Sequence, residues 1–181
     1  MIEQLEQLLA DDLLDELGTQ PITDLRALRV QCSEAEGDVS LVRRVAQGRL
    51  DIIGHDVRRR AGATDGEADV STLLFEMPDI MADEPRSGSA VPGSRPIDVS
   101  GPGVVAHLLT IELDKAASPS QLAEVRLLDD TQIREVFERL RGHEVELSIL
   151  RRRLHERIDA IQSEIARRYR DGEASVDTLL S

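Results

Sequence analysis

Five polar side chains recur along two segments of the chain with the same spacing, and their types suit ligand binding. The first set is Glu36, Ser40, Arg43, Gln47 and Asp51, and the second set is Glu144, Ser148, Arg151, His155 and Asp159. We call these sets the first and the second ladder. On an α-helix each ladder falls within an arc of roughly 80° and extends about 22 Å. Such a row of fixed donors and acceptors fits a ligand with flat hydrogen-bonding edges and negative charges better than it fits catalysis.

Both ladders lie beside an apolar pattern that is typical of paired helices. In the first segment the pattern consists of Leu25, Leu28, Cys32, Ala35, Val39, Val42, Ala46 and Ile53, and in the second of Ile133, Val136, Leu140, Leu147, Leu150, Leu154 and Ile161. Alternating steps of three and four residues predict the seam of a coiled coil or of a long helical hairpin. Arg49, His143 and Arg157 interrupt this seam. Each ladder lies about 100° from its seam, and the orientation of the helices decides whether the ladders share a groove.

The repeat extends beyond the ladders, with the same constant offset that relates one ladder to the other. The offset also relates Ile53 to Ile161 and the pair 59–60 to the pair 167–168, and after a two-residue slip 68–74 matches 174–180. Such self-similarity marks a shared structural role. We interpret the chain as a fused, monomeric duplication of a unit whose single-copy ancestor worked as a homodimer. The N-terminal helix has only the short segment 122–128 in the corresponding place, so we expect the duplication not to account for it.

The predicted fold is all-α, a long antiparallel two-helix coiled-coil hairpin with short flanking helices. The predicted parts of the single domain 1–181 are a short N-terminal helix within 1–18, a first ladder helix at 22–61, a connection at 62–117 and a second ladder helix at 130–171. The connection contains a Pro/Gly/Ser-rich tract at 87–96 that we expect to be flexible. Its segment 104–115 fits either a helix or a strand. Ser118 and Pro119 predict the start of a further short helix, and Asp130 or Thr131 is the expected cap of the second long helix.

Composition and charge limit the kinds of partner that the chain can bind and the covalent links that it can form. The net charge of −13 argues against direct DNA binding, and it is compatible with a basic protein partner. The acidic helix at 2–17 could bind such a partner in a groove, or it could fold back on the hairpin. The one cysteine, Cys32, excludes an intrachain disulfide. We find no membrane-spanning run and no signal peptide, and the expected location is the cytoplasm.

Motifs of enzymes and metal sites do not occur in the sequence. His143 and Glu144 begin like a zinc-binding HExxH motif, but Leu147 stands where the second histidine is needed. His155 and Asp159 lack a third ligand, so we predict neither a metal site nor an enzyme. A simpler interpretation of one ladder is a row of solvated ion pairs on the flank of a coiled coil. Two ladders in register, with serine and aspartate where ion pairing does not need them, favour ligand binding.

The Glu-x3-Ser-x2-Arg-x3-Gln-x3-Asp pattern resembles the signature of the RsiG family of actinobacterial anti-sigma factors. Members of that family sense cyclic-di-GMP and hold the sporulation sigma factor WhiG. The first ladder matches the signature at all five positions, and the second departs once, with His155 in place of glutamine. The resemblance implies that the ten ladder residues bind a pair of cyclic-di-GMP molecules and that the ligand-bound protein sequesters a WhiG-like sigma factor, repressing transcription initiation. The alternative is a ligand-free coiled-coil adaptor for a basic protein.

Overall fold

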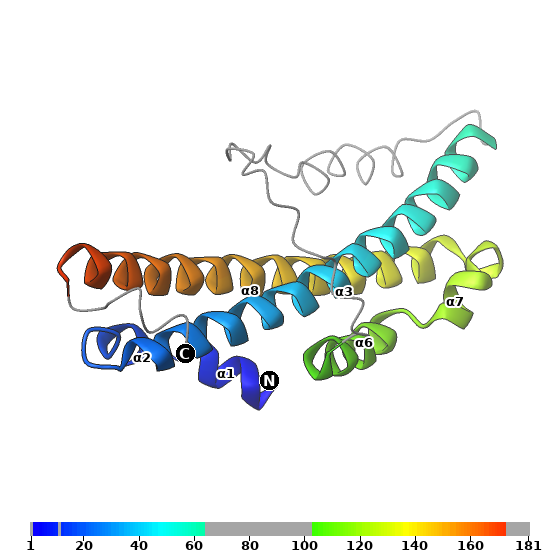
Figure 1. The fold of residues 1–181 in the computed structure, drawn as a ribbon. Helices are drawn as coiled ribbons and strands as arrows, with labels where there is room; N and C mark the ends of the chain where they lie inside the picture. The colour runs from blue at the N-terminus through cyan, green and yellow to red at the C-terminus, as the bar shows by residue number, and fades with distance from the viewer. Residues whose placement is uncertain (1, 11, 64–102, 173–181) are drawn as a thin grey trace. The chain divides into compact units, whose positions relative to one another are not determined.

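The computed structural model describes residues 2–10, 12–63 and 103–172, and every regular element within these ranges is helical (Figure 1). The elements are α1 (Glu3–Leu8), α2 (Asp12–Asp15), α3 (Ile22–Ala63), α6 (Val104–Ala116), α7 (Pro119–Ala123), the 3-10 helix η1 (Val125–Leu127) and α8 (Asp130–Arg170). The all-α prediction is confirmed. The tract 87–96 and the matching segments 68–74 and 174–180 lie outside the described residues. None of the helices in the described ranges combines the length and hydropathy that a membrane span requires.

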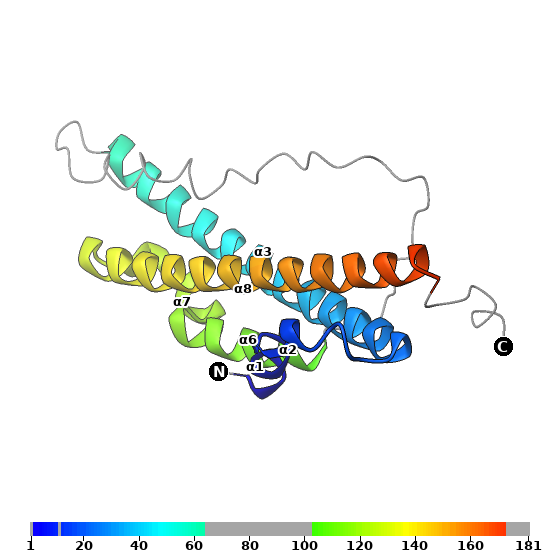
Figure 2. The ribbon, with the colours of Figure 1, turned by 90° about the vertical axis from the view of Figure 1, so that its left-hand side faces the viewer.

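The chain divides into two compact units. The first consists of Met1–Arg44, Pro102–Glu112 and Glu144–Ser181, and the second of Val45–Gly101 and Leu113–His143. Both long helices contribute to both units, and α8 is one uninterrupted helix along its whole length (Figure 2).

Within the first unit, α3 and α8 run antiparallel and pack through their apolar seams. Successive positions of α3 contact α8 residues in descending order, as shown by the hydrogen bonds of Arg26 with Tyr169, Arg29 with Gln162 and Arg43 with Glu144. The seam residues Cys32, Ala35, Val39 and Val42 of α3 are buried, as are Leu147, Leu154 and Ile161 of α8. This arrangement confirms the predicted helical hairpin.

The acidic N-terminal segment forms two short helices instead of the one predicted within 1–18. The chain leaves α1 at Leu9, whose carbonyl oxygen accepts hydrogen bonds from Arg153 at 2.9 Å and from Arg157 at 3.1 Å. These side chains take the place of the backbone N–H that a continuing helix would offer to this carbonyl. Leu5, Leu9 and Leu17 are buried. The apolar face of the segment therefore packs within the first unit, and of its two interpretations the folded-back one is confirmed.

Hydrogen bonds to backbone carbonyls show that the duplication includes this segment after all. Arg157 donates to the carbonyl of Leu9 and Arg49 donates to the carbonyl of Ala117, and the offset of the ladders relates both the donors and the acceptors. Arg49 also pairs with Asp114 at 2.5 Å. We call Arg49 and Arg157 the carbonyl anchors. The expectation that the duplication does not account for the N-terminal segment is wrong, because these contacts recur at the offset, as do residues such as Leu5 with Leu113 and Leu14 with Leu122.

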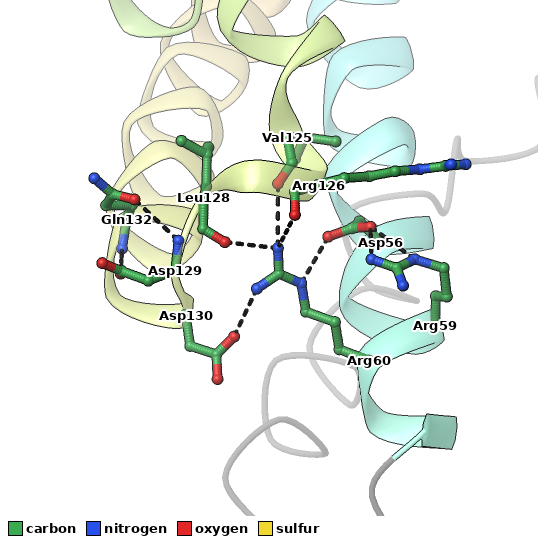
Figure 3. A network of polar contacts seen from close by, with 9 residues as sticks. All are labelled: Asp56, Arg59, Arg60, Val125, Arg126, Leu128, Asp129, Asp130 and Gln132. Carbon is green, nitrogen blue, oxygen red and sulfur yellow. Dashed lines mark hydrogen bonds and ion pairs between the residues drawn. The ribbon is translucent and has the colours of Figure 1, made fainter.

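A second set of equivalent contacts follows the carbonyl anchors along the long helices. Arg60 donates to the carbonyls of Val125 and Leu128 (Figure 3). At the equivalent positions of the repeat, Arg168 donates to the carbonyls of Leu17 and Gln20. One turn earlier, a carboxylate orients each arginine, Asp56 for Arg60 and Glu164 for Arg168. Burial alone would raise the pKa of Asp56, but hydrogen bonds from Arg59 and Arg60 outweigh it and lower that pKa.

Side-chain caps define where the helices of the second half begin. Ser118 accepts from the backbone N–H of Gln121, whose side chain accepts from the N–H of Ser118, so the predicted start at Ser118 is confirmed. The long helix α8 is capped in the same way by Asp129 and Gln132, and the cap is therefore one residue earlier than predicted. Both caps place their acceptor where the first turn leaves its N–H groups without a helical partner.

The segment 104–115, for which helix and strand were both open, is the helix α6. Asp38 of α3 accepts hydrogen bonds from the backbone N–H groups of Gly103 and Ala106, at 3.0 and 3.1 Å. A carboxylate at the start of a helix satisfies free N–H groups and complements the helix dipole. A Cβ at position 103 would overlap the Asp38 carboxylate, so a larger residue there would displace this side chain from the N–H groups it binds.

Candidate ligand site on the two ladders

Eight of the ten ladder residues belong to the first unit, three on α3 and five on α8. They are Glu36, Ser40 and Arg43 of the first ladder, and Glu144, Ser148, Arg151, His155 and Asp159 of the second. The remaining two, Gln47 and Asp51, belong to the second unit. Since α3 and α8 are antiparallel, the Glu end of each ladder runs beside the Arg of the other.

Two reciprocal ion pairs connect the ladders across the seam. Arg43 Nη1 lies 3.3 Å from Glu144 Oε1, and Arg151 Nε lies 3.3 Å from Glu36 Oε1. The two pairs occupy equivalent positions of the repeat. The glutamate of each copy therefore pairs with the arginine of the other copy. These four ladder residues therefore lie together within the first unit, which the seam pattern alone left open.

The ladder serines reinforce the two glutamates. Ser40 donates to Glu36 at 2.7 Å, and Ser148 donates to Glu144 at 3.0 Å, each within its own helix. A serine one turn after a glutamate keeps the carboxylate in one rotamer, because the hydroxyl bonds one oxygen. Serine, glutamate and the arginine of the opposite ladder thus act as one hydrogen-bonded group in each copy.

His155, the one residue of the second ladder that departs from the signature, also lies close to the ladder glutamate Glu36. His155 Nε2 lies 3.1 Å from Glu36 Oε1, the oxygen that Ser40 and Arg151 also contact. The histidine therefore points toward Glu36 from the position at which the signature has glutamine. Its side chain is 44% exposed.

The two equivalent ion pairs differ in burial. The side chains of Arg43 and Glu144 are 10% and 6% exposed, whereas those of Arg151 and Glu36 are 23% and 18% exposed. Both distances exceed the 2.7–2.9 Å that is usual for charge-assisted hydrogen bonds. A guanidinium has five N–H donors, so an arginine that one glutamate positions can also bind a further acceptor such as a phosphate or a guanine edge.

The aspartates at the far end of each ladder are oriented differently from the glutamates. Asp51 and Asp159 are exposed, and within the described part of the chain neither makes a hydrogen bond or an ion pair. Their carboxylates accept hydrogen bonds only. They are available to a ligand that offers N–H donors.

Two further arginines bring positive charge beside the ladders. Arg44 and Arg152 directly follow the ladder arginines, are exposed, and occupy equivalent positions of the repeat. The ladder glutamates already balance Arg43 and Arg151, so these neighbours supply positive charge that the two ion pairs do not neutralise. The chain is acidic overall, with a net charge of −13, but this face of the hairpin can attract an anion.

The described residues offer little to nucleophilic or metal chemistry beside the ladders. Burial raises the pKa of the Cys32 thiol, so this cysteine is a packing residue of the seam. Within 2–10, 12–63 and 103–172, no group of three or more His, Cys, Asp or Glu side chains is arranged to hold a metal ion.

Sequence reasoning missed the residues that anchor the short helices. Asp38, Arg49 and Arg157 hold backbone groups of other elements, and none was recognised from the sequence. A signal was present for two of them, because Arg49 and Arg157 interrupt the apolar seam at equivalent positions of the repeat. A charged residue that recurs in a seam indicates a shared buried partner, here a backbone carbonyl.

The comparison with family models agrees with the repeat and with the ladders. A model described as RsiG-like matches residues 11–77 and 119–181. The chain belongs to the RsiG-like family. The two matched segments begin at equivalent positions of the repeat, and each contains one ladder, so the RsiG-like match covers both copies. No curated protein gave a significant match. Membership in the RsiG-like family suggests an anti-sigma factor with a sigma factor as its partner, and a regulatory role in place of a catalytic one.

Proposed function

We propose that this protein is an anti-sigma factor that binds cyclic-di-GMP on its two ladders and, in the ligand-bound form, sequesters a sporulation sigma factor of the WhiG kind. The observation that carries the proposal is the reciprocity of the ladders. Arg43 contacts Glu144 and Arg151 contacts Glu36, so signature residues of both copies lie together on one face of the first unit.

The chemistry of this face matches the chemistry of the ligand. Cyclic-di-GMP has two phosphodiester anions and two guanine bases. Arg43 and Arg151 suit bidentate contacts with the O6 and N7 atoms of guanine or with phosphate. Asp51 and Asp159 suit the opposite edge of the base, where they accept from N1–H and the exocyclic amine. The two ladders share four of their five residue types, which suits a ligand with twofold symmetry.

The remaining ladder residues have supporting roles. Glu36 and Glu144 position the arginines across the seam, and the serines position the glutamates. Gln47 is assigned to the ligand on the signature alone. In the ligand-free protein the glutamates neutralise the arginines, so binding exchanges part of each ion pair for contacts with the anionic ligand. The exposed arginines beside the ladders favour that exchange.

A calorimetric titration with cyclic-di-GMP tests the proposal, with Asp159→Asn as the decisive variant. Asp159 is exposed and makes no polar contact within the described residues, so its loss leaves the hairpin intact. Losing one paired contact to a base costs about 1–3 kcal/mol, which weakens binding roughly 5- to 150-fold. The matched control is Glu156→Gln, an exposed carboxylate of the same helix outside the ladder.

Capture of a WhiG-type sigma factor by the immobilised protein, with and without cyclic-di-GMP, tests the second half of the proposal. We expect capture by the wild type only when the ligand is present, and weakened capture by Asp159→Asn at limiting ligand. A wild-type protein that ignores cyclic-di-GMP but still captures the sigma factor would contradict the ligand assignment, and the protein would then be the ligand-free adaptor.

A further inference from the structure

The two copies differ at the fourth ladder position, and the structure shows what the difference does. In the second ladder His155 Nε2 lies 3.1 Å from Glu36 Oε1, which also accepts from Ser40 at 2.7 Å and contacts Arg151 at 3.3 Å. One carboxylate oxygen therefore accepts from Ser40 and Arg151 and also lies beside the imidazole of His155. In the first ladder the equivalent residue is Gln47, an amide that does not titrate.

The charged groups around His155 come from both long helices. Glu36 faces it from α3, while Arg151 and Asp159 lie one turn away on either side along α8, with Arg152 at the i−3 position. Imidazole is the side chain whose charge ordinarily changes between about pH 5 and pH 8. At this position a proton adds one positive charge to a face that also carries Arg151 and Arg152.

We infer that His155 links the affinity of the ladder site for its anionic dinucleotide to protonation, in the second copy and not in the first. The inference rests on the proposed function, because it concerns the same ligand. The imidazolium places a cation where the signature has a neutral amide, and a ligand that bears two phosphodiester charges binds the protonated form more tightly. By linkage, binding takes up protons, and affinity falls as the pH rises through the imidazole range.

Titration of the full-length protein with cyclic-di-GMP at pH 6 and at pH 8 tests the inference. Each titration is repeated in two buffers with different heats of ionisation, so that the proton uptake is measured apart from the affinity. We expect the wild type to bind up to about tenfold more tightly at pH 6, the ratio that a one-unit difference in proton affinity allows. We also expect net proton uptake.

Two variants separate His155 from other histidines. His155→Gln restores the signature residue and should bind with nearly equal affinity at both pH values and without proton uptake. His107→Gln changes an exposed histidine of α6 and should behave as the wild type. A pH dependence that survives in His155→Gln, or a wild-type affinity that rises with pH, overturns this inference and leaves the proposed function intact. A wild type that does not bind at either pH overturns the proposed function itself.

Discussion

The two reciprocal ion pairs provide an internal comparison of a buried and a more exposed copy of the same interaction. Replacing Arg43 by methionine leaves the Glu144 carboxylate, only 6% exposed, with the hydrogen bond from Ser148 but without the guanidinium across the seam. Breaking a buried ion pair by removing one partner costs about 3–5 kcal/mol, because the remaining charge stays desolvated. We expect Arg43→Met to lower the free energy of unfolding by about this amount.

The equivalent change in the other copy should cost much less. After Arg151→Met, Glu36 is 18% exposed and keeps the hydrogen bond from Ser40, with His155 Nε2 3.1 Å away. Its cost should approach the 0–1 kcal/mol that is typical of exposed pairs. The exposed neighbour Arg152 serves as the control, and Arg152→Met should change the free energy of unfolding by less than about 0.5 kcal/mol.

Urea unfolding followed by far-ultraviolet circular dichroism, with linear extrapolation to water, measures these differences. A double variant sharpens the test, because replacing both members of a buried pair by apolar residues is close to neutral. Arg43→Met combined with Glu144→Leu should therefore recover most of the stability that Arg43→Met loses. Equal losses for Arg43→Met and Arg151→Met, or no recovery in the double variant, would refute the reasoning from burial.

Two further predictions concern the anchors of the short helices and the pH dependence of stability. Arg157→Met removes one of the two donors to the Leu9 carbonyl, and the other, Arg153, remains. The change should cost about 1.5–3 kcal/mol, the usual value of a hydrogen bond to a charged group, and should speed amide hydrogen exchange in α1; unchanged exchange would contradict it. Hydrogen bonds from Arg167 and Arg168 lower the pKa of Glu164 to about 2, below its ordinary 4.5. A depressed pKa stabilises the fold above about pH 4.5, and this contribution is lost as the pH falls toward 2. Glu164→Gln should therefore be less stable than the wild type at pH 6 and equal to it near pH 2. A difference in urea midpoint that stays constant between these pH values would argue against this.

The long helices could be predicted from the sequence because their signal is local. An apolar residue at every third or fourth position defines the buried side of a helix, whatever it packs against. The predicted ranges 22–61 and 130–171 therefore agree with α3 and α8 to within two residues. Side-chain caps are local as well, and Ser118 was recognised by type and by the proline that follows it.

The break in the N-terminal helix could not be predicted, because its cause is distant in sequence. The carbonyl of Leu9 is held by Arg153 and Arg157, which are 144 and 148 residues away. Nothing in the spacing of leucines at 2–17 reveals such donors. The extent of the duplication was missed for a related reason, since Arg49 and Arg157 bind backbone carbonyls and so leave the acceptor residues free to differ in side chain.

The contacts between the two ladders could be predicted only in part. Periodicity placed the ladder residues on one side of each helix, but only the orientation and register of the two helices bring Arg43 to Glu144 and Arg151 to Glu36. The antiparallel orientation was part of the predicted hairpin, but the register of α3 against α8 has no local signal in the sequence. The assignment of cyclic-di-GMP remains a prediction from the signature and from the chemistry of this face.

The fused duplication explains why the two halves of the site can differ. In a homodimer one gene supplies both ladders, and a change at the fourth position would appear in both at once. In the fused chain Gln47 and His155 occupy that position independently, and the ion pair of Arg43 is more buried than that of Arg151. The equivalent anchors, Arg49 and Arg157, have stayed the same because each holds a backbone segment against its unit. Fusion thus preserves the equivalent anchoring contacts in both copies, while one half of the proposed ligand site is free to acquire a titratable group.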